Sequence, residues 1–188
     1  PAYDGKEYPL PKPITQVAVA FSAPTNILLP AMRSALNVTS EDELRPQMSA
    51  VALDVSAEGI TFVGTNGKML YKYEWTHGMP FLTEGQPSIV LFPRTVINAM
   101  DAPFSKVEEI SVRSDGRQVE VTDGDVSFSI RSVEGRYPNY NSVIPKDNPY
   151  HVTLPVKDLM NTIRRVSIVA SDNSKLIALR RTDLFLQM

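Results

Sequence analysis

Three segments of the chain share one pattern of apolar and polar positions, centred on Pro24, Pro93 and Pro155. In each, alternate residues are apolar up to the proline, and apolar residues then recur at helical spacing. An alternating run predicts a strand, and proline suits the first turn of a helix because its φ is fixed and it has no N–H to donate. The prolines are roughly 65 positions apart, a spacing that is too long for solenoid repeats and suits half-domains.

The first two segments are each followed by further strand signals. Asn-Gly and Asp-Gly pairs separate these runs, and such pairs supply the positive-φ residues of tight hairpin turns. Each unit is therefore a strand, a helix and three strands. Two units make one α+β domain from about Gln16 to Gly135, with helices on one face of antiparallel sheets. The alternating runs lie at Met48–Val55, Gly59–Gly64, Met69–Trp75, Val107–Arg113, Gln118–Thr122 and Val126–Val133.

The third segment begins another unit at Tyr150. It predicts a strand before Pro155, a helix over Val156–Ala170, and strands at Leu176–Arg180 and Leu184–Met188. The pattern stops there, so we expect residues 150–188 to be the first half of a further domain. Residues 136–149 are rich in proline and tyrosine, and we expect them to form a stiff bridge between the domains.

Composition narrows the possible function. The chain has 188 residues, 43% of them hydrophobic and 21% charged, as in an ordinary globular protein. It contains no cysteine, which excludes disulfides, thiolate metal sites and cysteine nucleophiles and fits a reducing cytoplasm. No apolar run reaches the length of a membrane span. The formal net charge is −2, so any nucleic-acid contact must depend on a local basic patch.

No group of residues predicts catalysis or a bound metal or cofactor. The turn at Thr65–Lys68 is reminiscent of a phosphate loop, but it lacks the four-residue gap and the hydroxyl residue after the lysine. Asp115, Asp123 and Asp125 are explained as hairpin-turn residues. A β-rich binding module of the adhesion or carbohydrate-binding class stays open as an alternative, as does a phosphate-processing enzyme. Bound ligand at Thr65–Lys68 would favour the enzyme.

Four stretches of the sequence together resemble the bacterial DNA sliding clamp, the β subunit of the replicative polymerase. The resemblance covers nearly the whole chain, and the Gly-Arg-aromatic-Pro-x-Tyr bridge is its most specific part. It implies that residues 1–15 are the tail of a first domain with its linker, 16–135 the complete middle domain, 136–149 the bridge, and 150–188 a truncated third domain. The stretches are Glu134–Pro145, Thr65–Leu70, Leu91–Met100 and Ile163–Ser171.

The resemblance also implies a function. A sliding clamp is a non-enzymatic processivity factor, in which two subunits close into a ring around duplex DNA. The replicative polymerase, the clamp loader and repair proteins dock short peptides into an apolar pocket beside the bridge. Where the family's turn usually carries Asp, His and Arg, this chain has Asn66, Lys68 and Met69.

The peptide pocket implied by the resemblance combines apolar side chains with a glycine turn. On the residues alone, Met48, Leu70 and Val143 are better explained as ordinary core, because apolar residues are usually buried. An apolar groove edged by backbone polar groups would nonetheless suit an extended peptide with one or two anchors. The implied pocket residues are Met48, Thr65, Gly67, Leu70, Pro138 and Val143, with Arg45 at the margin.

Candidate DNA-facing residues come from helical geometry. On the third helix Lys157, Asn161 and Arg164 fall on one polar face, with Arg165 beside it. Arg33 and Arg94 take comparable outward positions on the other helices. A solvated helix face is an equally good explanation for each of these residues. The resemblance further implies that Ile168 and Val169 face the neighbouring subunit.

Overall fold

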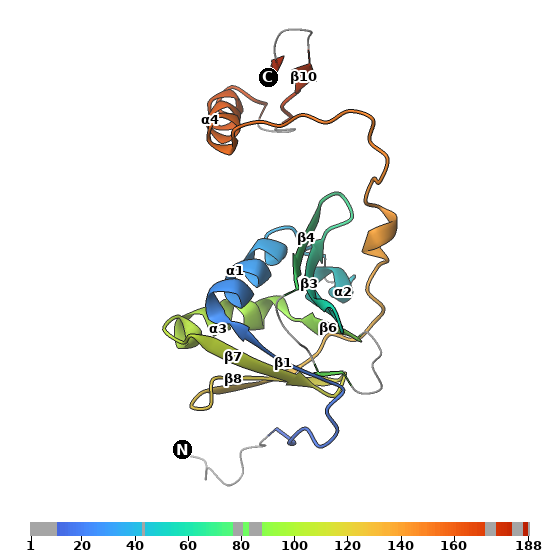
Figure 1. The fold of residues 1–188 in the computed structure, drawn as a ribbon, viewed down its shortest axis with the longest axis vertical. Coiled ribbons are helices and arrows are strands. Elements are labelled where there is room, and N and C mark those ends of the chain that lie inside the picture. Colours follow the sequence, from blue (N-terminus) through green and yellow to red (C-terminus); the bar gives the residue numbers. More distant parts are fainter. Residues whose placement is uncertain are drawn as a thin grey trace. The chain divides into compact units, whose positions relative to one another are not determined.

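The structure is a computed structural model of the chain, and it describes residues 11–42, 44–76, 81–82, 88–171, 176–181 and 186–187. The chain divides into two compact units, Pro1–Ser142 and Val143–Met188, shown in Figure 1. No helix among the described residues is long and apolar enough to cross a membrane.

The first unit contains the predicted repeat twice. Each copy is a strand, a helix and three strands, so the predicted order of elements is confirmed; a short helix and a two-residue strand are additional. The first copy comprises β1 (Val19–Pro24), α1 (Thr25–Leu36), α2 (Pro46–Ser49), β2 (Val51–Ser56), β3 (Gly59–Thr65) and β4 (Leu70–Trp75). After β5 (Phe81–Leu82), the second comprises β6 (Ser88–Phe92), α3 (Arg94–Phe104), β7 (Glu109–Ser114), β8 (Gln118–Thr122) and β9 (Ser127–Arg131).

The two copies exchange their first strands. One antiparallel sheet has the order β5-β1-β7-β8-β9 and the other the order β4-β3-β2-β6. Strand β1 thus opens the first copy but pairs with β7 of the second, with Phe21 opposite Val112. Strand β6 opens the second copy but pairs with β2 of the first, with Leu53 opposite Val90. Neither copy can complete a sheet alone, so the two form one cooperative unit.

Helices α1 and α3 pack against each other on one side of the sheets, as Figure 1 shows. Their buried faces are apolar at helical spacing: Leu28, Met32 and Ala35 on α1, and Ile97, Met100 and Phe104 on α3. These side chains join inward-facing strand residues such as Leu53 and Phe62 in a single core cluster. The helices on one face of antiparallel sheets are the arrangement that the sequence predicts.

Three predicted segments differ from the structure. Met48 and Ser49 belong to α2 rather than to a strand, because Pro46 starts a helical turn in which the Met48 N–H donates to the Arg45 carbonyl at 2.9 Å. Helix α4 (Val156–Ser167) ends before the predicted Ala170. Residues 150–155 form no strand, since among the described residues no strand pairs with them to supply backbone hydrogen bonds.

The second unit also contains one strand pair, β10 (Arg180–Arg181) with β11 (Leu186–Gln187). Of the predicted strand Leu176–Arg180, only Arg180 belongs to β10. Residues 184–185 and 188 of the predicted Leu184–Met188 strand lie outside the described residues.

Three hairpin turns of the first unit share one hydrogen-bonding pattern. Each reads Thr or Ser, then Asn or Asp, then Gly at positive φ. In the first, the Thr65 hydroxyl accepts the Gly67 N–H (3.1 Å) and donates to the Met69 carbonyl (2.7 Å). The Asn66 side-chain oxygen accepts the N–H groups of the two residues after the glycine, at 3.0 and 2.9 Å. The turns starting at Ser114 and Thr122 repeat these bonds with Asp in place of Asn.

The aspartates of these turns are held in their charged form. The backbone N–H of Gln118 lowers the pKa of Asp115, and the backbone N–H of Val126 lowers the pKa of Asp123. A carboxyl whose pKa is lower in the folded state stabilises the fold above its unfolded pKa, and that contribution is lost as the pH falls.

Asn66→Asp therefore tests the turn pattern. The new carboxylate should accept the same two N–H groups, so the variant should melt at or above the wild-type temperature at pH 7. Its melting temperature relative to wild type should then fall as the pH drops below about 4, the unfolded pKa of Asp. Asp123→Asn should show the opposite pH trend. Thermal melts at several pH values would check this, and a pH-independent difference would contradict it.

Gly64 is a position where strand β3 touches helix α1. A Cβ built on Gly64 would lie 2.0 Å from the Ala35 carbonyl oxygen, a backbone atom that cannot move aside. We expect Gly64→Ala to lower the free energy of unfolding by about 3 kcal/mol. Gly124→Ala, in an open turn with φ +103°, should cost only about 1 kcal/mol from backbone strain. Equal losses in urea melts would contradict this contact.

Candidate peptide groove and DNA-facing helices

The segment after β9 lies on the outer face of the β4-β3-β2-β6 sheet, opposite the core helices. Ala52, Val63 and Leu91 are cross-strand neighbours on that face, yet they are only 0%, 0% and 3% exposed. Tyr137, itself 5% exposed, is the large apolar residue of the segment, and its hydroxyl donates to the Val63 carbonyl at 3.4 Å. This first part of the bridge is therefore docked on the sheet.

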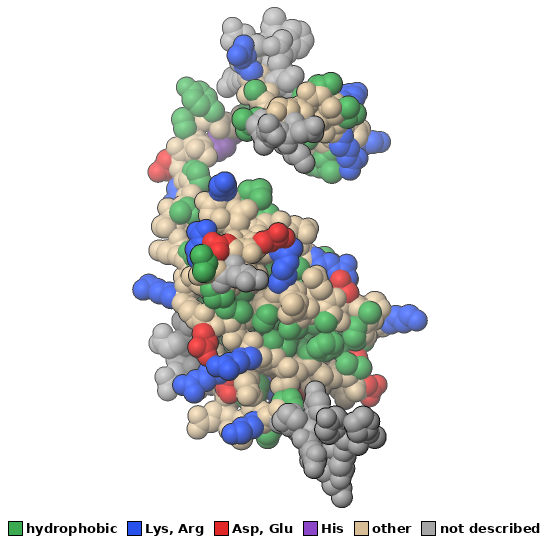
Figure 2. Space-filling view, turned by 180° about the vertical axis from the view of Figure 1, so that it is seen from behind, with side chains coloured by type: hydrophobic (Ala, Val, Ile, Leu, Met, Phe, Trp, Pro, Cys, Tyr) green, Lys and Arg blue, Asp and Glu red, His purple; other side chains and the backbone are tan. Residues whose placement is uncertain are grey.

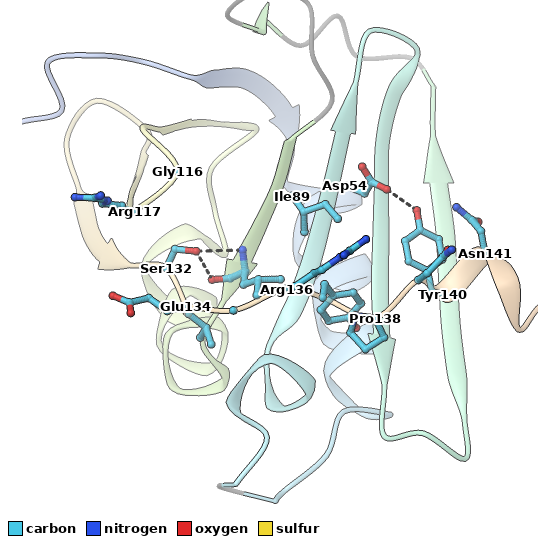
Figure 3. A pocket seen from close by; sticks show the side chains of 15 residues that line it. Asp54, Ile89, Gly116, Arg117, Ser132, Glu134, Arg136, Pro138, Tyr140 and Asn141 are labelled. Carbon is cyan, nitrogen blue, oxygen red and sulfur yellow. Dashed lines mark hydrogen bonds between the residues drawn. The ribbon is translucent and has the colours of Figure 1, made fainter.

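Polar contacts hold the next turn of the bridge, η3 (Tyr140–Ser142). The Tyr140 hydroxyl donates to Asp54 Oδ2 at 2.6 Å, as Figure 3 shows. The Lys72 ammonium lies 5.8 Å from the centre of the Tyr140 ring and 3.4 Å from Asn141 Oδ1. The bridge is thus tied to β2 and β4 as well as to β3.

Four of the predicted pocket residues come together beside α2. Met48 on α2 and Thr65 at the end of β3 are both 8% exposed. Leu70 opens β4 directly opposite Thr65 and is half-buried. A Cβ on Gly67 would lie 3.4 Å from Met48 Cε, so the turn approaches the methionine closely. The structure therefore brings these four residues together around the hairpin turn.

Arg45, which the resemblance puts at the margin of the pocket, lies beside Met48. It is the residue before α2, and its guanidinium is 4.0 Å from Met48 Sδ. Asp42 pairs with it at 2.9 Å. The backbone N–H of Leu44 and then Arg45 hold the pKa of Asp42 below its usual value. Sequence reasoning missed Asp42, although the Asp-x-x-Arg spacing is a signal for such a pair.

The other two predicted pocket residues, Pro138 and Val143, lie within the predicted bridge, residues 136–149. Pro138 is exposed between the two docked tyrosines. Val143 is the first residue of the second unit and is 68% exposed. The exposure of Val143 is inconsistent with its being an ordinary core residue, whereas the burial of Met48 is consistent with that explanation.

The turn at Thr65–Lys68 is poorly suited to hold phosphate. The N–H groups of Gly67, Lys68 and Met69 all donate to side chains of the turn itself. A phosphate loop needs such N–H groups free to point at the ligand. The hydrogen bonds of this turn therefore disfavour the phosphate-processing alternative.

Two of the candidate DNA-facing residues form ion pairs within the first unit. Arg33 on α1 pairs with Asp101 on α3, with Nε 2.7 Å from Oδ1. Arg94 at the start of α3 is 3.3 Å from Glu41 and also 3.3 Å from the Thr39 hydroxyl. Figure 2 accordingly shows basic and acidic side chains interspersed on this unit. Their positive charge is largely compensated.

Helix α4 of the second unit has a different surface. Lys157, Arg164 and Arg165 are exposed, and Arg165 donates to the Thr162 hydroxyl at 3.2 Å. Lys and Arg side chains gather on one side of this helix in Figure 2. Ile168 follows the helix as its C-cap, and it and Val169 are 82% and 84% exposed. These two are apolar residues in contact with solvent.

Comparison with known proteins gives one consistent result. No family model matches the chain. It is 27% identical over 169 residues to the β sliding clamp of Synechococcus elongatus, covering 89% of this chain and 45% of the relative. The β sliding clamp of Treponema pallidum is 25% identical over 163 residues, covering 86% of this chain and 43% of the relative.

Solved structures agree in fold. The Helicobacter pylori β clamp bound to a DNA ligase peptide matches with a TM-score of 0.79 and 20% identity, over 90% of this chain and 47% of that one. The Bacillus subtilis sliding clamp matches with a TM-score of 0.79 and 22% identity, over 90% and 44%. The chain is related in sequence and in fold to the bacterial β sliding clamps. It spans about half the length of the curated clamps it matches.

Two residues that position the bridge, Tyr137 and Tyr140, belong to the bridge motif of the sequence but had no predicted role. The pattern alone shows aromatic residues beside proline, which fits a stiff linker. The docking on the sheet depends on the outward-facing apolar pair Ala52 and Val63, which alternation alone would place in solvent. The sequence signal for this docking was an apolar residue on the face of a predicted strand that alternation assigns to solvent.

Alkaline titration would test the docking of the bridge. Burial raises the pKa of Tyr137 to about 12. Burial and then the Asp54 hydrogen bond raise the pKa of Tyr140. Both tyrosines thus have a higher pKa in the folded chain than the value of about 10 in the unfolded chain. Their contribution to the free energy of unfolding is therefore fully present below pH 10, and it is lost as the pH rises through the pKa values of the folded chain.

We expect tyrosinate absorbance to rise in a separate step at high pH, and the bridge to detach from the sheet in that same step. Tyr137→Phe and Tyr140→Phe should each remove part of that step, and Tyr140→Phe should cost about 1 kcal/mol at neutral pH. If all tyrosines ionise together near the unfolded pKa in wild type, the bridge is not docked in solution.

Proposed function

We propose that the chain is part of a DNA sliding clamp, a ring that encircles duplex DNA and keeps the replicative polymerase on its template. The observation that carries this proposal is the agreement of sequence and fold over about nine-tenths of the chain, with every reported relative a sliding clamp. The paired helices on one side of interlocked sheets support it, since a ring of such units can present helices to DNA and sheets to solvent.

In this proposal the ring acts by topology and not by chemistry. It needs no cofactor and works in the cytoplasm, where the bacterial chromosome lies. Contact with DNA should be loose, because tight phosphate contacts would slow sliding. The ion pairs of Arg33 and Arg94 suit this role, as they compensate the positive charge of these two side chains. Lys157, Arg164 and Arg165 would supply more of the attraction.

The proposed domain organisation follows the resemblance. Residues 16–135 would be a middle domain, 136–149 a bridge and 150–188 part of the next domain. Ile168 and Val169 would face a neighbouring subunit in a homodimeric ring, and their exposure supports a contact there.

The proposed partner site is the apolar groove beside α2. Met48 and Leu70 would receive the apolar anchors of a short peptide, and the Thr65–Gly67 turn would border its backbone. Pro138 and Val143 would complete the groove from the bridge side, with Arg45 at its edge. The solved H. pylori clamp holds a DNA ligase peptide. Polymerase, clamp loader and repair proteins would compete for the equivalent groove here.

Leu70→Asp tests the groove. A peptide of the Gln-x-x-Leu-Phe type should bind the wild-type chain, and the variant should bind it at least about tenfold more weakly, because a carboxylate would replace an apolar contact. Fluorescence anisotropy with a labelled peptide would measure the affinity. Val143→Asp should weaken binding likewise.

The matched control is Val126→Asp, which changes an apolar residue that is 38% exposed in a turn remote from α2. It should leave binding unchanged. If Leu70→Asp unfolds the chain and Val143→Asp binds normally, these residues do not form a peptide groove.

Salt dependence tests the DNA contact. We expect weak binding of duplex DNA by the chain, with log affinity falling steeply against log salt. Arg164→Glu should reduce that slope by about one to two, whereas Arg113→Glu, on the outer face of the other sheet, should leave it unchanged. Filter binding or anisotropy at several salt concentrations would measure both. Tight, salt-resistant binding would contradict loose contact.

A further inference from the structure

A cavity with a volume of about 540 Å³ lies on the first unit beside the bridge. Its walls are residues 132–141, which lead from β9 into the bridge, together with Asp54 on β2, Ile89 and Leu91 on β6, and the β7–β8 turn at Gly116 and Arg117. Of the predicted peptide-groove residues it includes only Pro138. We propose that this cavity is a separate binding site for an acidic, extended segment of a partner protein, with Arg136 holding a carboxylate of that segment.

Arg136 and Arg117 are the basic residues that line the cavity. Figure 3 shows Arg136 pointing across the cavity toward Ile89, Asp54 and Tyr140, while Arg117 points away from them. Among the described residues, none forms a hydrogen bond or an ion pair with the Arg136 guanidinium. The five N–H groups of this guanidinium therefore have no partner from the described chain. Their planar arrangement matches that of a carboxylate.

The acidic side chains of the cavity already have partners from the chain. Asp54 accepts the Tyr140 hydroxyl, and Glu134 pairs with Arg131 at 2.5 Å. Of the charged side chains that line the cavity, Arg136 and Arg117 form no ion pair among the described residues, and the Asp54 carboxylate accepts only a neutral hydroxyl, so the two guanidiniums outnumber the one unpaired carboxylate. Charge complementarity thus favours an anionic occupant over a basic or neutral one.

The walls favour a peptide as that occupant. Ile89 is 43% exposed on β6, and Pro138 is exposed on the bridge, so apolar surface borders the guanidinium. Strand β6 is at the edge of its sheet, and Leu91 of that strand already exchanges hydrogen bonds with Ser132 and Val133 of the bridge. A segment with an acidic residue next to an apolar one would match both features.

The contact should be modest in strength and sensitive to salt. Arg136 is exposed, and ion pairs open to solvent are weak and screened by ions. A bidentate guanidinium–carboxylate contact inside a hollow should exceed a free surface pair. We expect removal of the guanidinium to weaken binding about tenfold at low ionic strength.

The test uses the full chain labelled with ¹⁵N and a synthetic peptide of alternating Asp, Glu and Leu. A control peptide carries Asn and Gln in place of the acids. At low salt, the acidic peptide should shift the backbone amides of residues 132–141 and of Gly116, and the neutral peptide should not. Arg136→Ala should reduce the affinity about tenfold, and Arg136→Lys should have an intermediate effect because it keeps the charge without the planar fork.

Arg113→Ala is the matched control, since Arg113 is an exposed arginine that pairs with Glu120 away from this cavity. It should leave the peptide shifts unchanged. Arg131→Ala should weaken binding, because it leaves Glu134 without its partner at the cavity. The amide spectrum of each variant would show that it remains folded.

Three results would overturn the proposal. The acidic peptide could bind Arg136→Ala as well as it binds wild type. It could shift amides of the 65–70 turn instead of the bridge. A single-stranded oligonucleotide could shift the bridge amides when the acidic peptide does not, which would make the cavity a nucleic-acid site.

Discussion

The contact of Tyr137 with the outer face of the β4-β3-β2-β6 sheet determines the rest of the binding surface. Ala52, Val63 and Leu91 lie on the face that would otherwise meet water, and they are buried where the bridge covers them. Removing this apolar area from solvent stabilises the docked bridge, and the Tyr140–Asp54 hydrogen bond fixes its direction. The docked bridge also forms a wall of the cavity of Arg136.

This docking is built on sheets that neither repeat makes alone. Because β1 and β6 are exchanged, α1 and α3 are brought side by side, and their polar faces are left outside the core. The same exchange makes β6 an edge strand next to the end of β9, where the bridge begins. The proposed DNA side and the proposed partner side therefore follow from one topology: helices on one face of the sheets, and the bridge on the other.

Much of this fold could be predicted from alternation, proline positions and Asn-Gly or Asp-Gly turns. Those signals are local. The turns at Thr65, Ser114 and Thr122, for example, are held by hydrogen bonds between residues that are close together in the sequence. The exchange of strands could not be predicted, because pairing between β1 and β7 depends on contacts far apart in the sequence. The last two residues of α2, Met48 and Ser49, fall in the predicted strand because they continue the alternating pattern up to Val55. In the structure Pro46 starts a helical turn that includes both residues. The groove residues came from the resemblance, and the cavity around Arg136 had no sequence signal.

Hydrogen–deuterium exchange of wild type and Tyr137→Ala tests most directly whether the bridge contact organises the binding surface. The account predicts faster exchange in residues 50–65 and 132–142 of the variant, because both sides of the contact would open. Residues 109–131 in the other sheet should keep their protection, since β7, β8 and β9 pair among themselves and with β1. Unchanged protection of residues 132–142 in Tyr137→Ala would contradict the account.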